Sequence, residues 1–208
     1  METTNPRKAG ALILNNLSLF NEAAILMEQQ ITVKVFEVFQ EIISDWITKN
    51  GWRGEAEWLN EEENIWMLPI EWHSSLDEDL SQIAVFWFGY ENEDTDSYSI
   101  ADLCGCGQSR LGFFFSKGDS IKKSNWKIDQ NLFEEISEEL NLLGFKTTGD
   151  KYNAWFFPLI LESTKLATAY ENDDFDEAMQ PLLDALDSLL KARPVLDPLV
   201  TKIAAAVK

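Results

Sequence analysis

Acidic side chains gather in three short stretches of the sequence, and clustered carboxylates can bind a divalent cation or attract a basic partner. The clusters are Glu61, Glu62 and Glu63; Asp77, Glu78 and Asp79; and Glu91, Glu93, Asp94 and Asp96. All three lie between Gly54 and Ser109, where 14 acidic residues occur without a single Lys or Arg. This segment therefore concentrates negative charge that its own bases cannot neutralise.

The segment ENEDTD, residues 91–96, has the oxygen-rich composition of a calcium loop. An EF-hand loop needs glycine at its sixth position and a bidentate Glu at its twelfth. A loop that starts at Asn92 or Asp94 has serine at the sixth position, and Leu103 or Gly105 at the twelfth, so neither start fits. We therefore predict a partner-binding surface, with a different cation site and a solvated turn as open alternatives. Its predicted residues are Asp77, Glu78, Asp79, Glu91, Glu93, Asp94 and Asp96.

Two cysteines and one histidine are the other residues that could do chemistry. Cys104, Cys106 and His73 provide too few ligands for a closed zinc site, so we expect the thiols to lie in a turn between strands. A reactive thiol is the alternative, with Arg110 lowering a thiol pKa if it lies close. A nucleophilic triad would have to use His73 with Ser74 or Ser75, its neighbours in sequence, although neighbours on a loop seldom form one. We expect no catalytic residue, no metal and no cofactor.

The overall charge narrows the choice of partner. The chain has 36 acidic and 17 basic residues, a formal charge of −19. Such a surface repels nucleic acid and anionic lipid and attracts basic macromolecules. We therefore predict a protein that neutralises a basic partner, as an immunity protein, an antitoxin or a phage-type inhibitor of a nucleic-acid enzyme does, with nucleic-acid mimicry as one mode. The alternatives are a metal-dependent hydrolase or nuclease with a carboxylate site, and a chaperone or scaffold with a peptide groove near the C-terminus.

The tryptophans and cysteines add two expectations. Trp52, Trp58, Trp66 and Trp72 flank the first acidic cluster; most should be core residues, and one or two exposed indoles would suit a protein-binding surface. Two cysteines with a single residue between them cannot form a disulfide framework, and this favours a reducing compartment. No apolar run is long enough for a membrane span. We predict a cytosolic protein that does not bind membranes.

The texture of the sequence changes along the chain from helical to strand-like and back. Apolar residues recur at helical spacing through 13–27 and 31–46, and Gly51 should end the second helix. Strand-like stretches follow, at about 65–72, 82–90, 97–103, 111–117 and 152–160. Because both alternating sets of side chains are apolar in the second stretch, both faces of the sheet should be covered there, with helices on both sides.

These elements predict one α+β domain over residues 1–208. It consists of N-terminal helices in 1–51, a sheet region in 52–160 and a C-terminal helical hairpin with a terminal helix in 161–208. The sheet, of four to six mostly antiparallel strands, should pack between the N-terminal helix pair and the C-terminal helical cap. A further helix is expected at 132–143, and the C-terminal helices at 163–171, 174–190 and 195–207.

A local resemblance supports the C-terminal hairpin. The segment LATAYENDDFDEAMQPLLDAL, residues 166–186, resembles the turn and second helix of a single tetratricopeptide-type hairpin. The matching residues are Ala167, Tyr170, Phe175, Ala178 and Ala185. The turn is one residue short and the sequence has no second copy, whereas a solenoid needs about three repeats to bury its core. The resemblance therefore implies a helical hairpin and nothing more.

Overall fold

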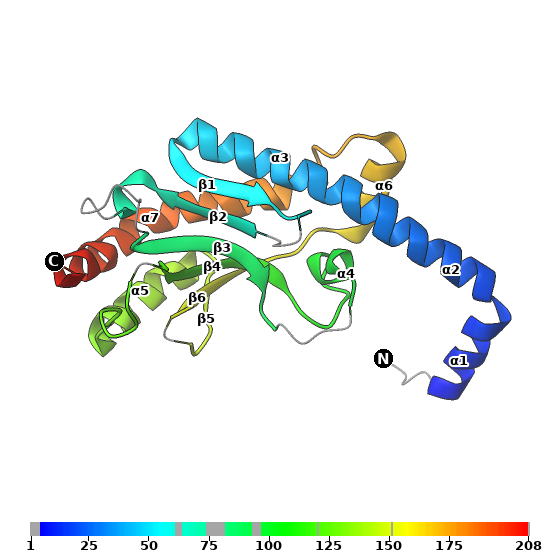
Figure 1. Cartoon of the computed structure of the whole chain (residues 1–208), viewed down its shortest axis with the longest axis horizontal. Coiled ribbons are helices and arrows are strands. Elements are labelled where there is room, and N and C mark those ends of the chain that lie inside the picture. Colours follow the sequence, from blue (N-terminus) through cyan, green and yellow to red (C-terminus); the bar gives the residue numbers. More distant parts are fainter. Residues whose placement is uncertain are drawn as a thin grey trace.

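The fold is built on one antiparallel sheet with helices flanking it (Figure 1), which confirms the predicted α+β class. The structure is a computed structural model that describes residues 5–60, 64–73, 82–92, 97–119, 121–150 and 152–207. The sheet has six strands in the order β1-β2-β3-β4-β6-β5. The strands are β1 (Trp52–Glu57), β2 (Asn64–Pro69), β3 (Ala84–Tyr90), β4 (Leu111–Lys117), β5 (Lys146–Thr147) and β6 (Trp155–Leu159).

The first two of the N-terminal helices form an arm that leads into the body of the protein, where the last one packs on the sheet (Figure 1). The N-terminal helices are α1 (Pro6–Asn15), α2 (Leu17–Leu26), the π-helical turn η1 (Met27–Ile31) and α3 (Thr32–Asn50). The bend of 88° falls at Asn16, and 17–50 is one continuous helix. The break between the two helices thus lies about a dozen residues earlier than the periodicity predicted. Gly51 ends α3 in the left-handed conformation, with φ of 65°, as expected.

In the described part of the chain, no single helix is long and apolar enough to cross a membrane. The bent pair of α1 and the helix 17–50 meets the length and composition criteria only when its two parts are taken together.

The prediction of a strand at 97–103 is wrong. Residues Ser99–Leu103 form a short helix, α4. Because β3 pairs directly with β4 along its whole length, from Ala84 opposite Lys117 to Tyr90 opposite Leu111, no strand edge is open for a strand between them. Ile100 and Leu103, three residues apart, are both buried from one side of the helical turn.

Strand β1 was not predicted, because alternating Glu55 and Glu57 make the segment look like a polar loop. It is an edge strand that pairs only with β2, and Trp52 is buried beneath α3 against Trp46. At an edge, one side of each residue pair can remain polar while the other packs on the core. The acidic residues of β1 are therefore compatible with a strand.

The C-terminal helices are α5 (Gln130–Leu142), α6 (Ser163–Asn172) and α7 (Gln180–Val207). The predicted break between 190 and 195 is wrong, since α7 runs through Pro194 and Pro198. Both prolines are exposed and four residues apart, on one face of the helix. The carbonyls that lose their hydrogen bonds can therefore be solvated. The turn before α7 spans 173–179, and α7 starts six residues later than predicted.

Helices α3, α5 and α7 pack on the face of the sheet that contains Phe86, Phe88, Phe113, Phe115 and Trp155. Phe39 of α3 contacts Phe88 at 5.0 Å between ring centroids, and Phe133 of α5 stacks on Trp155 at 5.2 Å. This face forms the main hydrophobic core. The predicted burial of Ile83 to Phe88 on both sides is confirmed for every residue but the half-buried Trp87.

Helices were expected on both faces of the sheet at β3, but on the second face the sheet's own rings lie over it instead. Trp87, Phe114 and Phe156 occupy neighbouring positions on β3, β4 and β6, and successive ring centroids are 4.5 Å apart. Glycine makes room for this arrangement, because a Cβ on Gly89 would lie 2.0 Å from the Trp87 ring and one on Gly112 would lie 2.7 Å from the Phe156 ring. We call this row of three rings the aromatic ladder.

Candidate functional site

Most of the predicted partner surface lies outside the described residues. Asp77, Glu78, Asp79, Glu93, Asp94 and Asp96 all fall there, together with the cluster Glu61 to Glu63. Glu91 is the one predicted site residue that the structure describes, at the end of β3. Whether the two acidic loops form one surface therefore stays a prediction.

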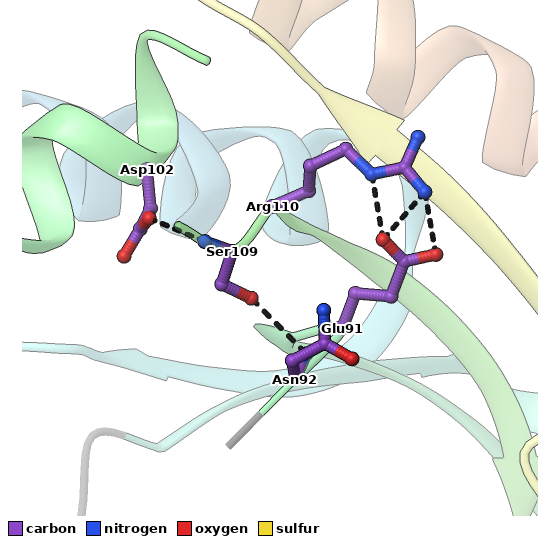
Figure 2. Close-up of polar contacts among 5 residues, drawn as sticks. All are labelled: Glu91, Asn92, Asp102, Ser109 and Arg110. Atoms are coloured by element: carbon purple, nitrogen blue, oxygen red, sulfur yellow. Dashed lines mark hydrogen bonds and ion pairs between the residues drawn. The ribbon is translucent and has the colours of Figure 1, made fainter. Parts of the chain in front are cut away.

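Glu91 is held by Arg110, across the ends of β3 and β4 (Figure 2). The backbone N–H of Glu91 donates to the carbonyl of Arg110 at 2.8 Å. The Arg110 Nε donates to one carboxylate oxygen at 2.6 Å, and a terminal guanidinium nitrogen donates to the other at 2.7 Å. The first base after the acidic segment thus folds back on it, so Glu91 carries less uncompensated charge than the sequence suggested.

Asp102 of α4 fixes the base of the same connection. Its side chain is fully buried, and it accepts hydrogen bonds from the Ser97 hydroxyl at 2.7 Å and the Ser109 backbone N–H at 2.8 Å. The Ser109 hydroxyl in turn accepts from the backbone N–H of Asn92 at 3.0 Å (Figure 2). A Cβ on Gly107 would lie 2.0 Å from the carboxylate. Asp102 therefore acts as a structural clamp on residues 92, 97 and 109, with its oxygens already occupied.

The two thiols lie in the turn after α4 and are not disulfide-bonded. Burial raises the pKa of the half-buried Cys104 thiol, and the neighbouring Cys106 raises it further. Cys106 is exposed, and its thiol donates to the Cys104 carbonyl at 3.5 Å. Since Arg110 is engaged by Glu91, it does not supply the stabilising positive charge that a reactive Cys104 thiolate would need.

His73 lies in an isolated bridge to Gln82, between β2 and β3. The serines that follow it, at 74 and 75, are outside the described residues, so the structure does not test the nucleophilic triad. Within the described ranges, no group of three or more His, Cys, Asp or Glu side chains is placed to hold a metal ion.

A hollow of about 380 Å³ lies on the second face of the sheet, beside the aromatic ladder. Its walls include two tryptophans, Trp66 of β2 and Trp87 of β3, which are opposite each other in register and both half-buried. Polar side chains complete it: Asn64, Gln82, Ser116, Lys117, Asp119 and Asn153. We call this hollow the tryptophan slot.

The sequence indicated one of the two tryptophans of the slot but not the other. Of the four tryptophans around the first acidic cluster, Trp52, Trp58 and Trp72 are core residues and Trp66 is not, as expected for most of them. The partner of Trp66 is Trp87, whose strand was predicted as wholly buried. Only the pairing of β2 with β3 brings the two indoles to the same hollow, and the apolar pattern of each strand taken alone does not say which strand lies beside it.

Two other hollows are less suggestive. One of about 720 Å³ lies at the start of α5, between Trp126, Phe133 and the turn at Gly149. Its charged groups Asp129 and Lys202 pair with each other. The other, of about 400 Å³, lies beside α6 near the predicted peptide groove, and the ion pair of Lys165 with Glu177 lies on its wall. Among the described residues, none of the buried polar atoms without a partner lies on the wall of either hollow.

Comparisons with protein-family models, with curated proteins and with solved structures give no significant match to this chain.

Proposed function

We propose that this protein is a cytoplasmic binding protein that neutralises or sequesters a basic macromolecule, as an immunity protein, antitoxin or phage-type inhibitor does. The observation that carries the proposal is the excess of 36 acidic over 17 basic residues. Pairing within the chain cannot remove this excess, because the bases are too few. The remaining charge repels itself and attracts a partner of opposite sign.

The ion pairs of the described residues support this view. They involve the acidic side chains of Glu71, Glu91, Asp129, Asp173, Glu177 and Asp197. All six ion pairs are partly exposed, and exposed ion pairs contribute little to stability. An acidic surface of this size therefore has little benefit for folding, and binding of a basic partner is a function that it would serve.

The N-terminal arm is a second feature suited to a binding protein. Neither α1 nor α2 has a buried residue. Large apolar side chains are exposed along the arm: Leu12, Ile13, Leu14, Leu17, Leu19, Phe20, Ile25 and Leu26. Contiguous exposed apolar surface usually marks an interaction site. The arm would add apolar contacts to a complex that the charged body brings together.

Charge-removal variants test the proposal. The first test variant replaces Asp77, Glu78 and Asp79 with Asn, Gln and Asn. The second replaces Glu93, Asp94 and Asp96 with Gln, Asn and Asn. Glu91 is left intact because it pairs with Arg110. The matched control replaces Glu135, Glu138 and Glu139, which are exposed on α5, with Gln and removes the same charge.

The partner is first captured from a lysate at low salt, identified by mass spectrometry and purified. Stopped-flow association is then measured at low and high ionic strength. We expect each test variant to associate about two- to tenfold more slowly than the control at low salt, with unchanged or higher melting temperature. Equal rates in test variants and control, or a captured partner that is acidic, would refute the proposal. A melting temperature raised by Ca²⁺ or Mg²⁺ only in the wild type would identify a cation site instead.

A further inference from the structure

The tryptophan slot lies where the aromatic ladder stops. The ladder crosses β6, β4 and β3 with rings about one strand spacing apart, and the next position is Trp66, directly opposite Trp87 on β2. Among the described residues no ring contact joins Trp66 to Trp87. The stack of contacting rings therefore ends at Trp87, whose indole lines the slot.

The two indoles donate hydrogen bonds to different neighbouring strands. The Trp66 N–H donates to Glu55 on β1 at 3.2 Å, on the side away from Trp87. The Trp87 N–H donates to Ser116 on β4 at 2.5 Å, on the side away from Trp66. Both rings line the hollow without a ring contact between them, so the hollow offers two indole walls to a flat group.

Polar groups around the slot favour a cation with several hydrogen-bond donors. Asp119 is exposed on its wall, and Gln82 and Asn64 add amide groups. Asn64 uses its side-chain N–H on Glu55 at 3.1 Å, which leaves its oxygen as an acceptor. Lys117 also lines the slot; its ammonium donates to the Gly118 carbonyl at 2.7 Å, keeps its positive charge and so opposes the attraction of a cation to Asp119.

We infer that the tryptophan slot receives an arginine side chain from the basic partner. A guanidinium is planar, stacks on indole faces and carries five donors for the oxygens at the rim. A lysine ammonium is compact and would leave the flat space unfilled. The inference rests on the proposed function for the source of the arginine, whereas recognition of the guanidinium depends on the slot alone.

The test uses the full-length protein labelled with ¹⁵N and small probes. N-acetyl-arginine amide is titrated while the indole N–H resonances are followed by NMR, with assignments made from Trp66→Leu and Trp87→Phe. The neutral isostere N-acetyl-citrulline amide, N-acetyl-lysine amide and methyl glucoside are titrated in parallel. We expect the arginine probe to shift the Trp66 and Trp87 resonances saturably and to bind about tenfold more tightly than the citrulline probe.

Variants separate the slot from a general attraction to the acidic surface. Asp119→Asn should weaken the arginine probe several-fold, and Lys117→Met should strengthen it. Asp45→Asn, which removes an exposed charge on α3, is the matched control and should change nothing. Trp66→Leu should abolish saturable binding, and a melting curve establishes that it is folded; Asp119→Asn keeps the test decisive if it is not. Equal binding of arginine and citrulline, tighter binding of the glucoside, or no saturable shift would overturn the inference.

The two proposals fail separately. If the arginine probe does not bind while the wild-type protein still captures a basic partner with strong salt dependence, the slot inference is wrong and the proposed function stands. If the arginine probe binds in the slot but the captured partner is acidic, the proposed function is wrong and the slot is a guanidinium site for another ligand.

Discussion

The indole N–H of Trp72 donates to the carboxylate of Asp197, 125 residues later in the chain, at 2.7 Å. Arg193, one turn before Asp197 on α7, pairs with Glu71 at 2.9 Å. Two neighbouring residues of the short 3₁₀ turn after β2, Glu71 and Trp72, are thus tied to two residues one helical turn apart. These bonds connect the sheet to the C-terminal helix on the core face.

Removing the acceptor should therefore cost more than an ordinary surface change. Trp72 is 2% exposed, so Asp197→Ala leaves its N–H buried without this partner, and we expect a loss of about 1 to 3 kcal/mol in the free energy of unfolding. Urea unfolding measures it. Asp187→Ala, at an exposed position on the same helix, is the control and should stay within about 0.5 kcal/mol of wild type. A loss at Asp197 no larger than at Asp187 would contradict the role of this bond.

The two faces of β3 should respond differently to truncation. Phe86 is fully buried and contacts the rings of Trp52, Trp72, Phe115 and Phe145. Phe86→Ala should cost about 3 to 5 kcal/mol in the free energy of unfolding, the usual range for a core aromatic. The half-buried Trp87 faces the slot, so Trp87→Ala should cost clearly less. Denaturant unfolding of the two variants measures the difference, and Phe86→Ala should have the lower midpoint. The reverse order would place the main core on the other face.

Periodicity was enough to predict the strands β2, β3 and β4, because each is a run of apolar residues bounded by polar turns. It failed where two patterns compete. Residues 97–103 alternate like a strand, yet Ile100 and Leu103 also satisfy the spacing of a helical turn, and the direct pairing of β3 with β4 decides for the helix. Pro194 looked like the end of a helix, but its exposed face tolerates the lost hydrogen bond.

The sites depend on register, which local sequence specifies poorly. Glu91 contacts Arg110 because Tyr90 lies opposite Leu111. Trp66 and Trp87 line one hollow because they lie opposite each other. The acidic excess, in contrast, needs no fold to be recognised. This is why a class of partner can be proposed from composition alone, whereas the slot needs the fold.

The pair of Asp129 with Lys202 should make stability depend on pH in the acid range. Its hydrogen bond from the Lys202 ammonium, helped by the backbone N–H of Leu132, lowers the pKa of the Asp129 carboxyl below its ordinary value. A carboxyl with a lowered folded pKa adds stability above its ordinary pKa, and that stability is lost as the pH falls through the folded pKa.

We therefore expect Asp129→Asn to have a lower melting temperature than wild type at neutral pH. The difference should disappear as the pH falls through the lowered pKa, because the wild-type carboxyl is then protonated too. Melting curves across the acid range follow it. Asp187→Asn should show no such change, and a difference that persists at the lowest pH would mean that the substitution acts through the helix cap and not through the ion pair.

The two thiols should differ in reactivity. Cys106 is exposed, whereas burial raises the pKa of Cys104 and so lowers its thiolate fraction. Under limiting iodoacetamide at mildly alkaline pH, we expect Cys106 to be alkylated first, as measured by peptide mass spectrometry. Unfolding in urea should make the two rates similar. Faster modification of Cys104 in the folded protein would show an activating environment that the structure does not contain.

The continuous helix 17–50 begins in solvent and ends in the core, since α2 has no buried residue and α3 buries one face against the sheet. Isolated helical segments of about ten residues are marginal in water, so opening of the backbone should become more costly with each turn toward Asn50. The same helix should therefore fray at its Leu17 end, while its packing on the sheet anchors the part that leads to Asn50. A partner that covered the arm would turn this gradient into a uniform protection, and the ordering of α1 and α2 would be part of the free energy of binding.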